Sequence, residues 1–180
     1  MARYRRVKGF YVMGWSLAAI VGVCSCKNPN APGASSSPTP KEISSSAQVV
    51  KAYGHFIPSA SPQANVELVI SPGFHINANP ATFPYLIATE VQPGKVEGLT
   101  VAEKLAYPQP KMGMFSFAEQ PLAVYEGSVT IPIPITPAPG AKGPRTIPFK
   151  IRVQACDTEK CYPPATVDAA LSIELDSIRR

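Results

Sequence analysis

Charge is scarce along most of this chain, and this scarcity limits the partners the chain can have. Charged residues make up 16% of its 180 residues, and no acidic residue occurs before Glu42. Four cations lie within the first eight residues, and the remaining 13 Lys and Arg are balanced by 12 Asp and Glu. A net charge of +1 outside that segment offers no basic surface of the kind that binds nucleic acid. We therefore exclude nucleic acid as a partner.

Helical periodicity and clusters of metal ligands are also missing. No stretch after the first 26 residues repeats its apolar positions every 3.6 residues, and the 21 prolines disfavour long helices. The chain has two histidines, His55 and His75, and both are far in sequence from the C-x4-C pair near the carboxyl end. Two cysteines supply only half of the four ligands that zinc normally takes. We therefore predict no metal site and no cofactor.

The first 25 residues have the features of a bacterial lipoprotein signal peptide. A basic segment, residues 1–8, precedes 15 residues without charge, which is shorter than the about 20 needed to span a membrane. The segment ends in Ser25-Cys26, and a small residue before a cysteine resembles the lipobox of lipoprotein precursors. We predict cleavage after Ser25, lipid modification of Cys26 and a membrane-anchored protein on the periplasmic side of the cell envelope.

The four cysteines are consistent with this cleavage site. Cys24 would leave with the signal and Cys26 would carry lipid, which leaves one pair. Residues 27–46 contain six serines and four prolines among 20 residues and almost no apolar side chain. Such a composition cannot bury enough surface to fold. We therefore predict a disordered tether over residues 26–46, before a domain over residues 47–176.

Apolar and polar residues alternate along most of this domain. Residues 147–155 and 167–175 do so almost without exception, as expected for strands with one buried face. Further strands are expected at 49–56, 66–70, 86–92, 96–102 and 124–135, the last at an edge or with a bulge because of Pro132 and Pro134. Several short strands separated by Pro and Gly turns predict an all-β fold, an immunoglobulin-like antiparallel β-sandwich.

The remaining cysteine pair, Cys156 and Cys161, lies at the end of a strand pair. Cys156 follows one patterned strand directly, and Cys161 comes shortly before the next, so a polar hairpin loop joins them. The spacing leaves two interpretations open. A bridge closing about six residues stabilises a fold by only roughly 2 kcal/mol, and an exposed disulfide is open to attack. The pair is therefore either a redox couple or a structural bridge.

The segment from Gln154 to Pro164, with Cys-Tyr-Pro-Pro at its end, resembles the amino-terminal periplasmic domain of the thiol:disulfide interchange protein DsbD. Pro72-Gly73-Phe74-His75-Ile76-Asn77 after an early strand adds to the resemblance, which covers roughly residues 49–175. The chain ends at Arg180, without the membrane channel and thioredoxin-like domain of full-length DsbD. The resemblance therefore predicts a stand-alone lipoprotein domain.

The resemblance implies thiol–disulfide exchange, with thioredoxin-like redox proteins as electron donor and acceptor. Cys161 would form mixed disulfides and Cys156 would resolve them. A cap loop, residues 111–120, would place Phe115 or Phe117 over the sulfurs. His75 and Tyr162 are candidate neighbours of the pair.

Two other hypotheses remain open at this point. One is a binding or scaffold β-sandwich whose disulfide is purely structural, in which case the protein is no oxidoreductase. The other is a copper-binding periplasmic lipoprotein that uses Met112, Met114 and His75.

Overall fold

The computed structural model describes residues 43–58 and 61–178, which form strands and two single turns of 3-10 helix. Within these ranges no helix is long and apolar enough to cross a membrane. The 3-10 turns are η1 (Ser46–Gln48) and η2 (Leu175–Ser177). The strands are β1 (Val50–Ile57), β2 (Gln63–Ile70), β3 (His75–Asn77), β4 (Glu90–Pro93), β5 (Leu99–Val101), β6 (Lys111–Gly113), β7 (Leu122–Tyr125), β8 (Ser128–Pro137), β9 (Pro144–Val153), β10 (Ala155–Cys156) and β11 (Ala165–Glu174).

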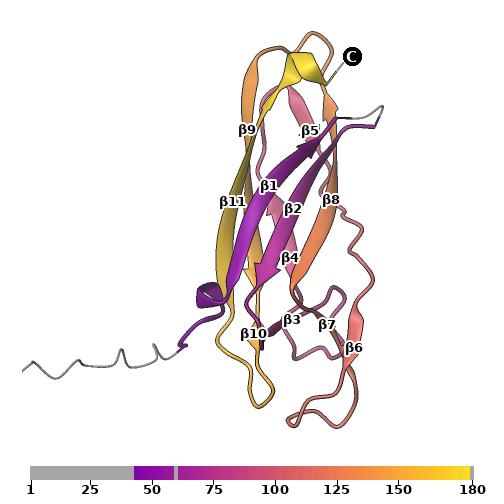
Figure 1. Ribbon diagram of the computed structural model, residues 1–180. Helices are drawn as coiled ribbons and strands as arrows, with labels where there is room; N and C mark the ends of the chain where they lie inside the picture. Colours follow the sequence, from indigo (N-terminus) through magenta and orange to yellow (C-terminus); the bar gives the residue numbers. More distant parts are fainter. Residues whose placement is uncertain (1–42, 59–60, 179–180) are drawn as a thin grey trace, which may run out of the picture. The chain divides into compact units, whose positions relative to one another are not determined.

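Two antiparallel sheets, β1-β2-β8-β5 and β11-β9-β4, enclose the core between them (Figure 1). Each contributes the apolar side of its long strands, because alternate residues of a strand point to opposite faces. Side chains such as Leu68 and Ile131 from the first sheet, and Phe149 and Ile151 from the second, are almost completely buried in one cluster. The polar residues between them remain exposed.

The long strand β9 behaves as its sequence predicts. Ile147, Phe149, Ile151 and Val153 are each at most 1% exposed, and the residues between them face solvent. β9 pairs with β11 over ten residue pairs, from Val153 opposite Ala165 to Pro144 opposite Glu174. The predicted all-β, immunoglobulin-like antiparallel sandwich is thus confirmed.

A third, small sheet, β10-β3-β7-β6, forms one end of the domain, at the bottom of Figure 1. The chain enters it at Gln154, where it leaves the pairing of β9 with β11 and joins β3 instead. Cys156 lies opposite His75 in this pairing. The small sheet therefore brings the cysteine pair next to a segment about 80 positions earlier in the sequence.

Two of the expected strands differ from those observed. The segment 124–135 was expected to be one strand, but the chain turns at Glu126-Gly127, where Gly127 adopts a φ of 66°, and separates β7 from β8. The segment 86–92 was expected to be extended throughout, but β4 begins only at Glu90. β8 lies between β2 and β5 and is therefore not an edge strand. β5 pairs with β8 at residues 135–137, and the Ala102 amide, directly after β5, donates to the Pro134 carbonyl at 3.0 Å. Pro132 lies before this stretch, in the part of β8 that pairs with β2.

The predicted signal peptide, Cys26 and most of the tether lie outside the described residues. The final residues assigned to the tether are part of the folded domain. Ser45 and Gln48 form a capping box around η1, and Ser46 is completely buried. Ordered structure therefore begins no later than this turn.

Candidate redox site at the cysteine hairpin

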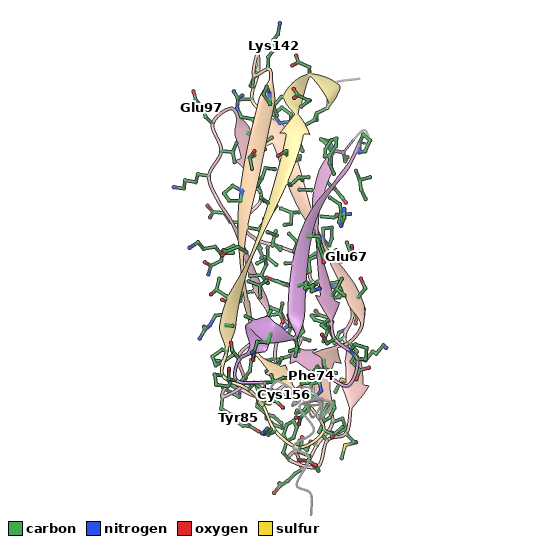
Figure 2. The ribbon with its side chains drawn as sticks, turned by 60° about the vertical axis from the view of Figure 1, so that its left-hand side comes forward. Glu67, Phe74, Tyr85, Glu97, Lys142 and Cys156 are labelled. Atoms are coloured by element: carbon green, nitrogen blue, oxygen red, sulfur yellow. A yellow bond between two sulfur atoms is a disulfide. The ribbon has the colours of Figure 1, made fainter. Side chains whose placement is uncertain are left out.

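Cys156 and Cys161 form a disulfide at the open end of the small sheet. The S–S distance is 1.97 Å, and the two Cα atoms are 3.9 Å apart. The backbones of the two cysteines form an isolated antiparallel β-bridge. Cys156 is completely buried, whereas Cys161 is partly exposed. Figure 2 shows Cys156 at the same end of the domain as Phe74 and Tyr85. A reagent approaching from solvent therefore reaches Cys161 before Cys156.

The turn between the cysteines is held by its own hydrogen bonds. The Asp157 amide donates to the Lys160 carbonyl at 2.9 Å, and the Tyr162 amide donates to the Ala155 carbonyl at 2.8 Å. Asp157 Oδ1 accepts from the amides of Glu159 and Lys160, both at 2.8 Å. Such an Asx turn is favoured by an aspartate at the first position of a tight loop. These bonds keep the two cysteines within one rigid hairpin.

Asp157 also binds the side chain of Tyr162, which sequence analysis predicted as a neighbour of the pair. The Tyr162 hydroxyl donates to Asp157 Oδ2 at 2.6 Å. This bond, the amides of Glu159 and Lys160, and the charge of Lys160 together lower the pKa of Asp157. An ionised carboxylate directly after Cys156 opposes formation of a thiolate at that cysteine. Asp157 binds residues on both sides of Cys161 as well, so its charge does not separate the two cysteines. Burial does, and it makes Cys156 the less reactive member of the pair.

His75 lies opposite Cys156 in the β3–β10 pairing and is 2% exposed. Directly paired residues of neighbouring strands place their Cβ atoms about 4.5–5.5 Å apart, on the same face of the sheet. Its Nε2 has no hydrogen-bond partner. Burial lowers the pKa of His75, while the charges of Glu126 and Asp157 act in the opposite direction. The imidazole beside Cys156 is therefore neutral at pH 7.

The predicted cap segment, residues 111–120, covers this histidine. The Phe115 ring stacks on the His75 imidazole with 3.8 Å between centroids and 19° between planes. Phe117 lies parallel to the same imidazole at 6.3 Å and to Phe115 at 5.7 Å. The Ser116 hydroxyl donates to the Thr158 carbonyl at 2.6 Å and so joins the cap to the turn between the cysteines. Residues 111–113 of the cap are paired with β7. Beyond them, the Ser116 hydrogen bond and the stack of three rings hold the cap against His75 and the cysteine turn.

Gly113 gives Phe115 the space it needs, so Gly113→Ala should open the cap. A Cβ atom at position 113 would lie 2.6 Å from Cζ and 2.8 Å from Cε2 of Phe115. The end of a flexible side chain moves more readily than backbone, so we expect the ring to leave His75 while the fold persists. Aromatic stacking contributes about 0.5–1.5 kcal/mol. Reduced Gly113→Ala protein should therefore react with oxidised glutathione about twofold to tenfold faster than reduced wild-type protein.

Phe115→Ala is the matched control for this prediction. It should raise the same rate by a similar factor. The double variant should react no faster than Phe115→Ala, because both substitutions remove the same contact, the stacking of Phe115 on His75. Additive effects of the two substitutions would contradict the role assigned to Gly113.

Sequence analysis missed several residues that hold the site together. The Ser46 hydroxyl donates to the Pro163 carbonyl at 2.7 Å and accepts from the Ala155 amide at 2.8 Å. The Gln154 side chain accepts from Asn77 Nδ2 and from the Ile87 amide, both at 3.1 Å. For Ser46, the one signal in the sequence was the capping-box pattern Ser-x-x-Gln at residues 45–48, which predicts an ordered turn there.

Met112 and Met114, the residues of the copper hypothesis, are 63% and 65% exposed. His75, the third residue of that hypothesis, is buried beneath Phe115. Among the described residues, no group of three or more His, Cys, Asp and Glu side chains is arranged to hold a metal ion.

The fold and the site together define a class of protein: an all-β domain with one short-range disulfide, whose turn is hydrogen-bonded to an aromatic loop. The family model described as "Thiol:disulfide interchange protein DsbD, N-terminal" matches residues 46–173. The chain belongs to this family. The family and the Cys156–Cys161 disulfide together support thiol–disulfide exchange as the chemistry of the domain.

Two solved structures are similar to the chain at low sequence identity. The reduced amino-terminal domain of DsbD from Neisseria meningitidis is 16% identical with a TM-score of 0.37, over 67% of this chain and 84% of that one. The amino-terminal periplasmic domain of ScsB from Proteus mirabilis is 14% identical with a TM-score of 0.40, over 71% of this chain and 45% of that one. No curated protein matches the chain.

Proposed function

We propose that Cys156 and Cys161 cycle between dithiol and disulfide and relay electrons between thioredoxin-like proteins. The observation that carries this proposal is the unequal exposure of the two cysteines within one short hairpin. Exchange requires one sulfur that a bulky partner can reach and a second that resolves the mixed disulfide. Cys161 and Cys156 meet these two requirements.

The proposed location is the periplasmic side of the cell envelope, with a lipid anchor on Cys26. Family membership supports a periplasmic domain, since both similar structures are amino-terminal domains of this kind and one is described as periplasmic. The lipobox-like Ser25-Cys26 supports the anchor. Disulfide formation is available in that compartment.

The reduction potential of the Cys156–Cys161 couple tests the proposed function. Structural disulfides have potentials below about −300 mV, and working couples are more oxidising. We expect a potential above this limit, because the bridge closes a short hairpin and one of its sulfurs is accessible. The measurement equilibrates the full chain in dithiothreitol buffers and counts alkylated thiols by mass spectrometry.

The measurement is made in a Cys24→Ser and Cys26→Ser background. Only Cys156 and Cys161 can then be alkylated, so the added mass reports on this pair alone. A potential well below −300 mV would identify a structural bridge and favour the scaffold hypothesis.

A further inference from the structure

A groove of about 390 Å³ opens beside Cys161. Tyr85 and Leu86, from the loop between β3 and β4, contribute to its lining, as do Phe117, Ala118 and Leu122, from the cap and the start of β7. Cys161 itself is part of the lining. We call this feature the Cys161 groove.

The Cys161 groove exposes aromatic surface to solvent. Tyr85 is 75% exposed, the most of the large hydrophobic side chains in the described part of the chain, and Phe117 is 38% exposed. Figure 2 shows Tyr85 at the cysteine end of the domain. Exposed apolar surface gathered in one place, rather than scattered singly, is typical of a site where another molecule binds.

The loop that carries Tyr85 is fixed relative to the cysteines. The rings of Phe83 and Tyr85 stack at 5.3 Å with 6° between planes, and the Leu86 amide donates to the Phe83 carbonyl at 3.1 Å. The next residue, Ile87, donates its amide to the side chain of Gln154, two positions before Cys156. A partner would therefore meet a surface that is already ordered, which lowers the entropic cost of binding.

We propose that the Cys161 groove binds the polypeptide segment that flanks the reacting cysteine of a partner protein, and that this segment is apolar. The proposal rests on the proposed function and adds the chemistry of the partner. A mixed disulfide holds the partner's sulfur about 2.05 Å from Sγ of Cys161. The residues next to the partner's cysteine must then lie along the groove that contains Cys161.

The charges in the lining point to the same kind of occupant. Glu159 and Lys160 are the charged side chains among the lining residues, and they carry opposite signs. The groove therefore has no net charge with which to attract an acidic or a basic segment. Aromatic and aliphatic side chains gain most of their binding free energy from burial of apolar surface.

The reaction served by the groove balances as follows. The Cys161 thiolate of the reduced domain attacks the partner's disulfide, and the leaving sulfur departs as a thiolate that takes up a proton from solvent. The Cys156 thiol loses its proton, and its thiolate attacks the Cys161 sulfur of the mixed disulfide. The bond between Cys161 and the partner breaks, and the partner's second sulfur leaves as a thiolate that takes up a proton. The domain is oxidised by two electrons, and one partner disulfide is reduced.

The test uses two short peptides, each with a central cysteine activated as a disulfide with pyridine-2-thiol. Leucines flank the cysteine in one peptide and serines in the other. The protein is the reduced full chain with Cys24→Ser and Cys26→Ser. When its thiolate attacks an activated peptide, pyridine-2-thione leaves, and the absorbance of the thione gives the rate of this reaction. We expect wild-type protein to react about tenfold faster with the leucine peptide, the lower end of the range for one methylene group in an apolar pocket.

Tyr85→Ala should lose most of this preference, so that its rate with the leucine peptide approaches that with the serine peptide. Tyr53→Ala is the matched control, because Tyr53 is a 45% exposed tyrosine on β1, outside the groove lining. It should keep the wild-type preference.

Three results would overturn the proposal. Wild-type protein could show no preference for the leucine peptide, or Tyr85→Ala could keep the full preference. Sedimentation could also reveal a wild-type dimer that Tyr85→Ala converts to monomer, in which case the occupant is a second copy of the chain. A reduced wild-type protein that reacts with neither peptide would instead contradict the proposed function, and the groove proposal would fall with it.

Discussion

Cys156→Ser should accumulate a stable mixed disulfide at Cys161 when treated with oxidised glutathione, and Cys161→Ser should accumulate little. Cys161 is partly exposed, so its thiolate can attack the glutathione disulfide. In the Cys156→Ser variant no second thiol of the pair remains to release glutathione. In the Cys161→Ser variant the remaining cysteine is completely buried and belongs to β10, whose backbone is paired with β3.

The difference in rate between the two variants should be large. Reaction at Cys156 requires local opening of the hairpin, and each 1.4 kcal/mol of opening free energy slows it by about tenfold. We therefore expect adduct formation at Cys161 to be at least about tenfold faster. Intact-mass spectrometry in a Cys24→Ser and Cys26→Ser background measures the adduct directly.

Wild-type protein is the control, since its adduct should be transient and end as the internal disulfide. Equal adduct formation in both single variants would refute the division of roles between the two cysteines. Absence of adduct in both would refute the exchange function.

Local patterns were sufficient to predict the long strands of the sandwich. From Ile147 to the end of β9 every second residue is apolar and the rest are polar or proline, so the strand has one orientation that buries Phe149 and Ile151 together. A shift by one residue would expose all of its apolar side chains. The cysteine hairpin was predictable for a similar reason, because a polar turn directly follows this strand.

The surroundings of the cysteines depend on contacts between distant segments, which no local pattern encodes. The chain changes sheets at Gln154, and only this change places Cys156 opposite His75. The segment 86–92 has the composition of a strand, yet its first residues form a loop held by Gln154 and Asn77. The family resemblance predicted the cap segment, but the stacking of Phe115 on His75 depends on a contact between segments about 40 residues apart.

Ser46 shows most clearly what composition conceals. It ends a segment rich in serine and proline, whose composition predicts a disordered tether. Its single hydroxyl nevertheless bonds to Ala155, which precedes Cys156, and to Pro163, two residues after Cys161. The Ser46 amide donates to the same Pro163 carbonyl at 3.2 Å. One buried residue from the amino-terminal turn thus connects the two arms of the cysteine hairpin.

Ser46→Ala should therefore destabilise the domain and make the disulfide easier to reduce. The substitution leaves the Ala155 amide without its partner in a buried place, and a lost partner of this kind costs about 1–3 kcal/mol of unfolding free energy. The two sulfurs must move apart on reduction, and a link between the arms resists that movement. Its loss should favour the dithiol and shift the reduction potential to a less negative value.

Urea unfolding and dithiothreitol titration measure the two effects separately, and Ser44→Ala is the matched control. Ser44 is an exposed serine two positions earlier, so its substitution should change neither quantity measurably. The potential is the decisive measurement. If Ser46 only stabilised the fold, its substitution would lower the unfolding free energy of the oxidised and the reduced forms equally, and the potential would not change. Linkage requires that a shift in potential equal the difference between those two losses. A Ser46→Ala protein that is less stable but keeps the wild-type potential would show that Ser46 supports the fold without positioning the cysteines.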